Sequence, residues 1–132
     1  MTKKEKIIVV CGEFDPLTLE DIRLLKKARE KGDWLCVGLH SDQFMDLCRG
    51  GHVMNFGERK EIVESIKYVN EVFQFNDLDG TCCQLLRLIK FCYPMANIHF
   101  VSIEDMHNMP ETKIAGIRSE EHTSELQSPD HL

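Results

Sequence analysis

The chain has 132 residues, a length that suits one domain with a hydrophobic core of its own. Hydrophobic residues make up 42% and charged residues 29%, as is usual for a globular protein, and the formal net charge of −6 excludes a general nucleic-acid footprint. No apolar run reaches the length of a membrane span, and the first residues, MTKKEK, lack the apolar stretch of a signal peptide. We therefore expect a cytoplasmic protein with no nucleic-acid and no membrane partner.

Residues 7–21, IIVVCGEFDPLTLED, predict a strand, a glycine turn and the start of a helix. The apolar, β-branched run over residues 7–11 is typical of a buried strand, and the helix is expected over residues 19–31 with Leu19 and Leu25 on its apolar face. Thr18 can cap this helix, with Asp21 in the capping-box position. Backbone N–H groups and the helix dipole favour an anion at such a helix N-terminus, so this turn is a candidate phosphate site.

The rest of the chain alternates between strand and helix patterns. Residues 34–39, WLCVGL, predict a second buried strand, which completes a βαβ unit and hence a parallel sheet. Further patterns predict helices over 41–47 and 57–68, a strand over 71–75, a helix from residue 81, and a strand over 98–102, with residues 103–117 irregular. This order is typical of an α/β fold that binds ligands beyond the carboxyl ends of its strands.

Residues 118–132 form a segment of a different kind. The stretch RSEEHTSELQS has no apolar period and resembles the translated reading frame of a common sequencing-library adapter. We therefore expect a domain over residues 1–117 that lacks its native C-terminus, followed by a non-native or disordered tail.

The six cysteines and six histidines show no ligand spacing for a metal. There is no CxxC pair, and no two histidines stand four residues apart. We therefore expect reduced, mostly buried thiols and assign no side chain as a metal ligand.

Three stretches of the chain resemble a known family. GEFDPLTLED, GDWLCVGLHSDQF and GGHVMNFGERKEIVESIKYVNEV are similar to segments of the small nucleotidyltransferases with a Rossmann-like fold, such as the glycerol-phosphate and choline-phosphate cytidylyltransferases and the heptose-phosphate adenylyltransferases. The resemblance covers residues 7–106 and is most specific over residues 51–72. It implies a Rossmann-like parallel sheet flanked by helices. It also implies transfer of CMP or AMP from a nucleoside triphosphate to a small phosphorylated acceptor, release of pyrophosphate, Mg²⁺ with CTP or ATP as co-substrate, and a homodimer.

Several positions match the pattern of this family. Arg59 matches an arginine that, in the family, helps to bind substrate and nucleotide phosphates, and the alternative is a solvated surface arginine. Arg49 is the residue that could replace a family lysine in the preceding loop, and the alternative is a flexible loop arginine. The resemblance assigns nucleotide binding to Gly12, Glu13, Phe14, Asp15 and Asp105. Asp15 could instead only order its turn.

The sequence departs from the family at the head of the first helix. The family signature HxGH supplies two histidines that stabilise phosphate charge, whereas residues 18–21 here read TLED. Thr18 can replace a charged hydrogen bond only with a neutral one, and positioned groups of this kind are each worth about 10²- to 10⁴-fold in rate. The predicted catalytic set is Thr18, Asp21, Arg49 and Arg59.

Two hypotheses accommodate this departure. In the first, the protein is an enzyme, and Glu13, Asp15, Glu20 and Asp21 could gather around one turn to hold Mg²⁺. The favoured alternative for Glu20 and Asp21 is that they are first-turn residues that face solvent. In the second hypothesis, catalysis has been lost and the same fold serves as an inactive nucleotide-binding or interaction module.

Overall fold

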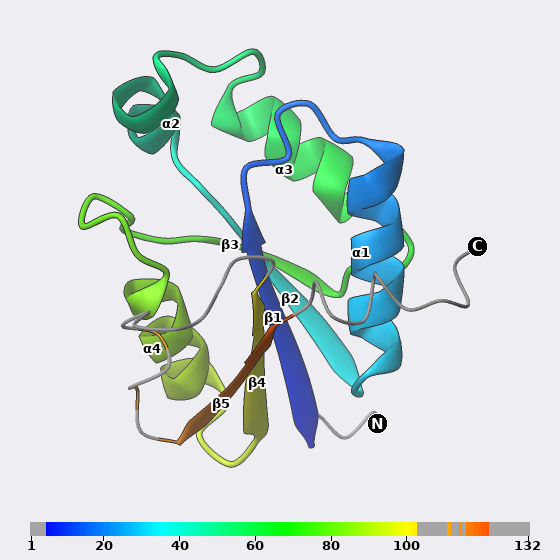
Figure 1. Cartoon of the computed structure of the whole chain (residues 1–132). Helices are drawn as coiled ribbons and strands as arrows, with labels where there is room; N and C mark the ends of the chain where they lie inside the picture. Colours follow the sequence, from blue (N-terminus) through cyan, green and yellow to red (C-terminus); the bar gives the residue numbers. More distant parts are fainter. Residues whose placement is uncertain (1–4, 103–110, 112–113, 115, 122–132) are drawn as a thin grey trace.

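Five parallel strands form one sheet in the order β3-β2-β1-β4-β5 (Figure 1). The structure is a computed structural model that describes residues 5–102, 111, 114 and 116–121. The strands are β1 (Lys6–Gly12), β2 (Trp34–Leu39), β3 (Glu71–Gln74), β4 (Asn97–Ser102) and β5 (Ile117–Glu121). The chain winds outward from β1 to β3 and then returns to the other side of β1 for β4 and β5. Open α/β sheets bind ligands at the point where the winding reverses, which here lies between β1 and β4.

The described helices cover both faces of the sheet. α1 (Leu19–Glu30) and α3 (Phe56–Glu64) lie on one face and α4 (Cys83–Cys92) lies on the other, while α2 (Asp42–Arg49) follows the carboxyl end of β2 (Figure 1). This arrangement confirms the predicted Rossmann-like parallel sheet flanked by helices. Within the part of the chain that the structure describes, no helix has both the length and the apolar character needed to cross a membrane.

Alternate residues of β1 enter two separate hydrophobic clusters. Ile8 and Val10 pack with the buried residues of α1 and α3, whereas Ile7 and Val9 pack with those of α4. Successive side chains of a strand point to opposite faces of the sheet, so a strand covered on both faces needs apolar residues at every position. This is the physical reason why the unbroken run IIVV predicted a buried strand.

Helix α4 lies close against β2 because residue 38 is a glycine. A Cβ atom at this position would stand 2.3 Å from Cδ2 of Leu85, a fully buried residue of α4, so any larger residue would have to displace the Leu85 side chain. The helix of a parallel crossover runs back along the sheet, and its N-terminus therefore lies at the carboxyl edge of the strands. Cys82, the N-cap residue of α4, is thereby placed near the ends of β1 and β2.

The predicted helices agree with the observed ones except in detail. The helix expected over residues 57–68 ends at Glu64. The hydroxyl of Ser65 donates a hydrogen bond of 2.8 Å to the carbonyl oxygen of Glu61, and such local bonds compete with helix continuation. Leu19 was expected on the apolar face of α1, but it is 60% exposed, and Leu24 joins Leu25 in the core instead.

Strand β5 was not predicted. Residue 117 was expected to be irregular and residues 118–121 to belong to the tail, but Ile117–Glu121 pairs in parallel with β4, with Ile98 opposite Ile117. An edge strand needs only backbone hydrogen bonds on one side, so it forms without the apolar alternation by which strands are recognised. Residues 118–121 therefore belong to an edge strand, while the expectation of a domain over residues 1–117 followed by a non-native or disordered tail stays a prediction.

Candidate functional site

Two pockets, each of about 250 Å³, lie at the carboxyl edge of the sheet. The turn pocket lies between the end of β1 and the N-terminus of α1 and is lined by Cys11, Gly12, Glu13, Phe14, Asp15, Pro16, Thr18, Asp21, Leu24 and Arg49. The switch pocket lies where the winding reverses and is lined by Cys11, Gly12, Glu13, His40, Phe44, Gly80, Cys82, Phe100, Ser102 and Glu111. Because three residues at the end of β1 line both pockets, the two form one continuous region along this edge.

The turn pocket brings together all of the predicted site residues except Arg59 and Asp105. Asp105 lies outside the described residues. Arg59 lies in α3, and its backbone and side chain are fully buried. The region expected from the sequence to hold a phosphate is therefore a real cavity in the structure.

The head of α1 is closed by the predicted capping box. The backbone N–H of Asp21 donates to Oγ1 of Thr18 at 3.3 Å, and the backbone N–H of Thr18 donates to Oδ2 of Asp21 at 2.9 Å. Each of these side chains satisfies a backbone donor that would otherwise lack a partner at the helix end. Two of the positions predicted to be catalytic are therefore engaged in holding the helix N-terminus.

Gly12 allows the first turn to fold back on the strand. A Cβ atom at Gly12 would stand 2.9 Å from the ring of Phe14, so the aromatic ring occupies the space of a side chain at residue 12. Phe14 itself is 5% exposed and adopts a φ of 48°, in the left-handed region that costs free energy for a non-glycine residue. Burial of the ring offsets this cost, and the turn is held in a defined shape beneath the pocket.

Asp15 ties the first turn to the loop before α3. Its carboxylate accepts hydrogen bonds from the backbone N–H groups of Val53 at 2.7 Å and Met54 at 2.6 Å. Partial burial alone would raise the pKa of Asp15, but these two bonds and the charge of Arg59 outweigh it and lower the pKa. Asp15 thus orders its turn, in agreement with the alternative, and its role in nucleotide binding stays a prediction.

Arg59 is a buried clamp rather than a surface arginine. Its Nη1 donates to the carbonyl oxygens of Glu13 at 3.1 Å and His40 at 2.8 Å. Its Nε donates to the carbonyl oxygen of Met54 at 3.0 Å, and its Nη2 donates to Asp42 at 2.7 Å. Its guanidinium points at protein oxygens and no part of the residue is exposed, so Arg59 is not the solvated surface arginine of the alternative, and its contact with phosphates stays a prediction. Arg59 joins the three loops that border the site.

Arg49 is the cation of the turn pocket. It lies at the last position of α2, its side chain is 54% exposed, and its Nη1 pairs with the carboxylate of Glu13. A partly exposed ion pair of this kind is worth little on its own, so an incoming anion can compete for the guanidinium at small cost. The predicted contact of Arg49 with a phosphate would thus require only that this ion pair be exchanged, and it stays a prediction.

The carboxylates of the first turn do not form a site for Mg²⁺. Glu13 is paired with Arg49, Asp15 holds backbone N–H groups, and Asp21 caps α1. Glu20 is exposed and stands 3.9 Å from Arg23, on the outside of the helix. The hypothesis of a Mg²⁺-binding cluster at this turn is therefore not supported, and the alternative, that Glu20 and Asp21 are first-turn helix residues, agrees with the structure.

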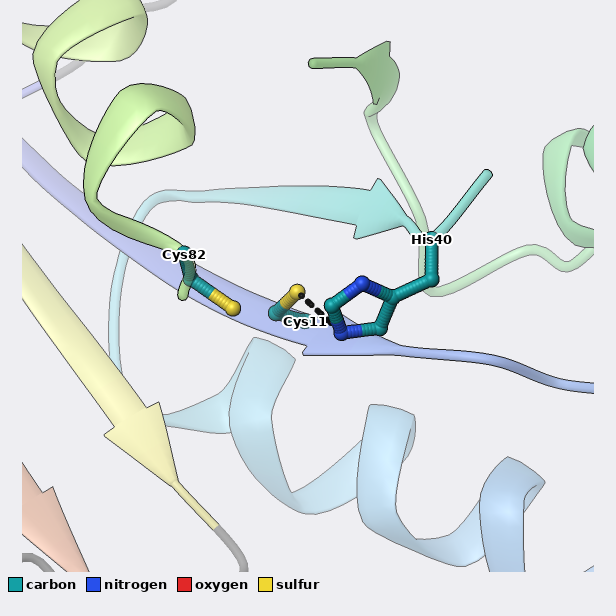
Figure 2. A group of neighbouring side chains, drawn as sticks. All are labelled: Cys11, His40 and Cys82. Atoms are coloured by element: carbon teal, nitrogen blue, oxygen red, sulfur yellow. Dashed lines mark hydrogen bonds between the residues drawn. The ribbon is translucent and has the colours of Figure 1, made fainter. Parts of the chain in front are cut away.

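A group of possible metal ligands that was missed in the sequence borders the switch pocket. The ligand atoms of Cys11, His40 and Cys82 all lie within 4.8 Å of one another, and Figure 2 shows the two thiols and the imidazole pointing towards a common point. The residues stand at the end of β1, just after β2 and at the head of α4. Spacing along the chain gave no sign of them. The signal that could have found them is that each one lies at the carboxyl edge of the same parallel sheet.

Burial and mutual hydrogen bonds perturb these groups. The hydrogen bond with Cys11, together with the hydrogen bond and charge of His40, lowers the pKa of the Cys82 thiol to about 7, against the opposing effect of burial. Burial raises the pKa of the Cys11 thiol. Burial alone would lower the pKa of His40, but hydrogen bonds with Cys82 and Asp77 outweigh it and raise the pKa. At neutral pH, Cys82 is thus the thiol that loses its proton more readily.

Comparison with known proteins places this geometry in a family. Residues 9–124 match the family described as cytidylyltransferase-like. The chain is 42% identical over 69 residues to an ethanolamine-phosphate cytidylyltransferase of Arabidopsis thaliana, a match that covers 51% of this chain and 16% of that protein. It is 37% identical over 67 residues to a glycerol-3-phosphate cytidylyltransferase of Staphylococcus aureus, covering 51% of each. It is 42% identical over 74 residues to an FAD synthase of Thermococcus sibiricus, covering 54% of this chain and 50% of that one. The chain thus spans about half or less of the length of these relatives.

Solved structures show the same fold at low sequence identity. A lipopolysaccharide core biosynthesis protein from Thermoplasma volcanium aligns with a TM-score of 0.65 and 16% identity over 87% of this chain and 93% of its own. A protein described as a nicotinate-nucleotide adenylyltransferase from Vibrio parahaemolyticus aligns with a TM-score of 0.61 and 18% identity over 89% of this chain and 76% of its own. The fold and the match over most of the sequence agree with each other, and the chain belongs to the cytidylyltransferase-like family.

Proposed function

We propose that the protein is a nucleotidyltransferase that transfers CMP or AMP from CTP or ATP to a small phosphorylated acceptor, with release of pyrophosphate. The observation that carries this proposal is the turn pocket, in which the N-terminus of α1 and the cation Arg49 face one cavity. Orphan backbone N–H groups and the helix dipole favour an anion there. In this proposal, the triphosphate occupies the turn pocket and Arg49 leaves Glu13 to contact it.

The proposed nucleotidyl transfer needs few catalytic groups from the protein. An acceptor phosphate oxygen attacks the α-phosphorus, the bond to the bridging oxygen breaks, and pyrophosphate leaves. Such transfers depend mainly on positioning and on stabilisation of charge. Arg49 and the hydroxyl of Thr18 would supply hydrogen bonds to the phosphates, and Arg59 would hold the loops in place. The side chains of the turn pocket offer no convergent ligands for Mg²⁺, so we propose that Mg²⁺ enters bound to the nucleotide.

A second candidate, an inactive nucleotide-binding module, is favoured by one specific observation. Thr18 and Asp21 stand where the family signature has histidines, and both are engaged in the capping box. Asp21 also adds negative charge at the lining of the pocket. Like charges about 4 Å apart repel by about 1 kcal/mol in water and by about 4 kcal/mol at an effective dielectric constant of 20. Binding without turnover is the outcome that would distinguish this candidate from the enzyme.

Calorimetry and a turnover assay distinguish the two candidates. We would titrate the protein with CTP and with ATP, in the presence and absence of Mg²⁺, and measure pyrophosphate release with phosphorylated polyols and sugars. The enzyme requires both binding and turnover, whereas the module requires binding alone, and the absence of binding by both nucleotides would refute both.

Arg49→Ala should weaken nucleotide binding, whereas Arg23→Ala, which removes an exposed arginine of α1 outside the pocket, should not. Sedimentation of the same samples tests the homodimer, which stays a prediction, as does the cytoplasmic location.

A further inference from the structure

We propose that Cys11, His40 and Cys82 bind a borderline-soft divalent cation, with Zn²⁺ as the ion of best fit. The residues come from three different elements, yet their ligand atoms lie within 4.8 Å of one another beside the switch pocket (Figure 2). Two thiolates and one imidazole are a ligand set found in proteins that bind Zn²⁺. The proposal does not rest on nucleotide transfer, because its test needs neither nucleotide nor acceptor.

The spacing of the ligand atoms suits a tetrahedral ion. Bonds of about 2.3 Å to sulfur and about 2.0 Å to nitrogen place neighbouring ligands of a tetrahedral Zn²⁺ about 3.5 Å apart. The distance from Sγ of Cys11 to Nε2 of His40 is 3.5 Å. A small rotation of the Cys82 side chain, with its ligand atom inside the same 4.8 Å limit, would complete the face of three ligands.

His40 is held with the correct nitrogen towards the two sulfurs. Its Nδ1 lies 3.0 Å from Oδ2 of Asp77, a carboxylate that is 1% exposed and also accepts from the backbone N–H and the hydroxyl of Ser41. A proton on Nδ1 shared with Asp77 leaves the lone pair on Nε2 free to bind a metal. The ring also stacks on Phe44 with centroids 3.9 Å apart, which fixes its plane. A carboxylate behind a histidine is the usual support of a metal-binding imidazole.

Glu111 supplies an independent sign that a cation belongs here. The residue is 3% exposed and lines the switch pocket, and its Oε2 accepts a hydrogen bond of 2.7 Å from the backbone N–H of Cys82. Its Oε1 is buried and has no hydrogen-bond partner among the described residues. A buried carboxylate oxygen without a donor is costly unless positive charge lies nearby. A divalent ion held by Cys11, His40 and Cys82 would supply that charge.

The fourth position of the ion would face the switch pocket. Three protein ligands with one open position are typical of Zn²⁺ sites that accept water or a substrate atom, whereas closed sites have four protein ligands. Binding converts two thiols to thiolates and releases up to two protons to solvent, so affinity rises with pH. The ion would also join the ends of β1 and β2 to the head of α4.

Metal titration of the full chain tests the proposal. The metal-free protein, kept in a thiol reductant that does not bind metals, would be titrated with Zn²⁺ against a chromophoric chelator and with Co²⁺ by absorption spectroscopy. We expect one ion per chain and, with Co²⁺, the intense visible bands and the near-ultraviolet charge-transfer band of a tetrahedral site with thiolate ligands. Zn²⁺ should also raise the midpoint of thermal unfolding, because it binds the folded state.

Four variants and two controls identify the ligands. Cys11→Ser, His40→Gln and Cys82→Ser should each lower the affinity by about 100-fold or more, and Asp77→Asn, which leaves all three ligands in place but weakens the support of the imidazole, by about 10- to 100-fold. Cys48→Ser and Cys92→Ser change exposed cysteines and should leave the affinity and the Co²⁺ spectrum unaltered. Circular dichroism of each variant without metal shows whether it folds.

The outcomes are decisive in both directions. One tight site in the parent protein and in both control variants, lost in folded variants of Cys11, His40 or Cys82, supports the proposal. The proposal is overturned if the parent binds no Zn²⁺ more tightly than a folded Cys11→Ser/Cys82→Ser double variant, or if the Co²⁺ spectrum lacks the thiolate band. It is also overturned if either control variant abolishes binding, since the ion would then lie elsewhere.

Discussion

The guanidinium of Arg59 donates a hydrogen bond of 3.1 Å to the backbone carbonyl oxygen of Glu13, which lies 46 positions earlier in the chain. The same guanidinium bonds to the loop after β2 and to the loop before α3. Loops carry most binding residues, but alone they are poorly fixed in space. A single buried cation that joins three loops gives this site a shape that none of the loops could keep by itself.

Replacement of Arg59 by alanine should lower the free energy of unfolding by about 3 kcal/mol, because it leaves buried oxygens without donors. The free energy of unfolding of Arg59→Lys should lie between those of the parent and Arg59→Ala, since an ammonium cannot reach all of these oxygens. Urea midpoints at constant m-value give the comparison. Arg23→Ala, at an arginine whose side chain is 62% exposed, is the matched control and should change stability by less than about 0.5 kcal/mol. Equal stability of Arg59→Ala and Arg23→Ala would contradict the clamp.

The role of Arg59 also shows which features of the fold and the site could be predicted from the sequence and which could not. The apolar runs of residues 7–11 and 34–39 and the caps of the helices predicted the sheet and α1 correctly, because they depend on local pattern. Whether an arginine is exposed or buried depends on what the rest of the chain brings to it. The sequence placed Arg59 at the site but could not show that its donors face protein oxygens.

The sequence did not predict that Cys11, His40 and Cys82 lie close together, for a related reason. Metal motifs are recognised by short spacings along one segment, whereas these ligands stand on three elements and meet only through the register of β1, β2 and α4. β5 was missed because its residues IRSEE carry no apolar alternation and its pairing with β4 is made by the backbone. Both omissions concern contacts between segments that are distant in sequence.

Gly12→Ala should lower the free energy of unfolding by about 1 to 3 kcal/mol, because the added methyl group would displace the ring of Phe14. It should also weaken nucleotide binding, since the ring shapes the floor of the turn pocket. Gly57→Ala in α3 is the control: the nearest atom to its added Cβ is Oδ1 of Asn55 at 3.4 Å, and alanine favours the helix, so stability should be unchanged or slightly higher. Chemical denaturation of both variants checks the difference, and a harmless Gly12→Ala would contradict the close packing.

Removal of the Asp15 carboxylate should destabilise the protein in a pH-dependent manner. The pKa of Asp15 is lowered in the folded protein, so its contribution to stability is present above its ordinary pKa of 3.8 and is lost as the pH falls through the lower folded value. The difference in unfolding free energy between the parent and Asp15→Ala should therefore be constant near neutral pH and shrink below about pH 4.

Asp15→Asn separates charge from shape, because the amide keeps one acceptor oxygen for the N–H groups of Val53 and Met54 but does not titrate. Its loss of stability near neutral pH should be smaller than that of Asp15→Ala. Urea midpoints measured from pH 3 upward give both comparisons, and a difference that grows on acidification would show that the carboxylate is not stabilised by these donors.

Restoration of the family signature at the head of α1 tests whether the missing histidines limit turnover. The triple variant Thr18→His, Glu20→Gly, Asp21→His removes two acidic groups from the first turn of α1, one of which lines the turn pocket, and adds two side chains that can donate charged hydrogen bonds. We expect pyrophosphate release to rise by about 10²-fold or more, because positioned groups of this kind are each worth about 10²- to 10⁴-fold.

The triple variant also loses the capping box, so its free energy of unfolding should fall by about 1 to 2 kcal/mol, which urea denaturation measures. Arg23→His, which adds an exposed histidine elsewhere on α1, should change neither quantity much. If the folded triple variant binds CTP or ATP as the parent does but releases pyrophosphate no faster, the histidines are not what limits catalysis, and the inactive module becomes the better account of this fold.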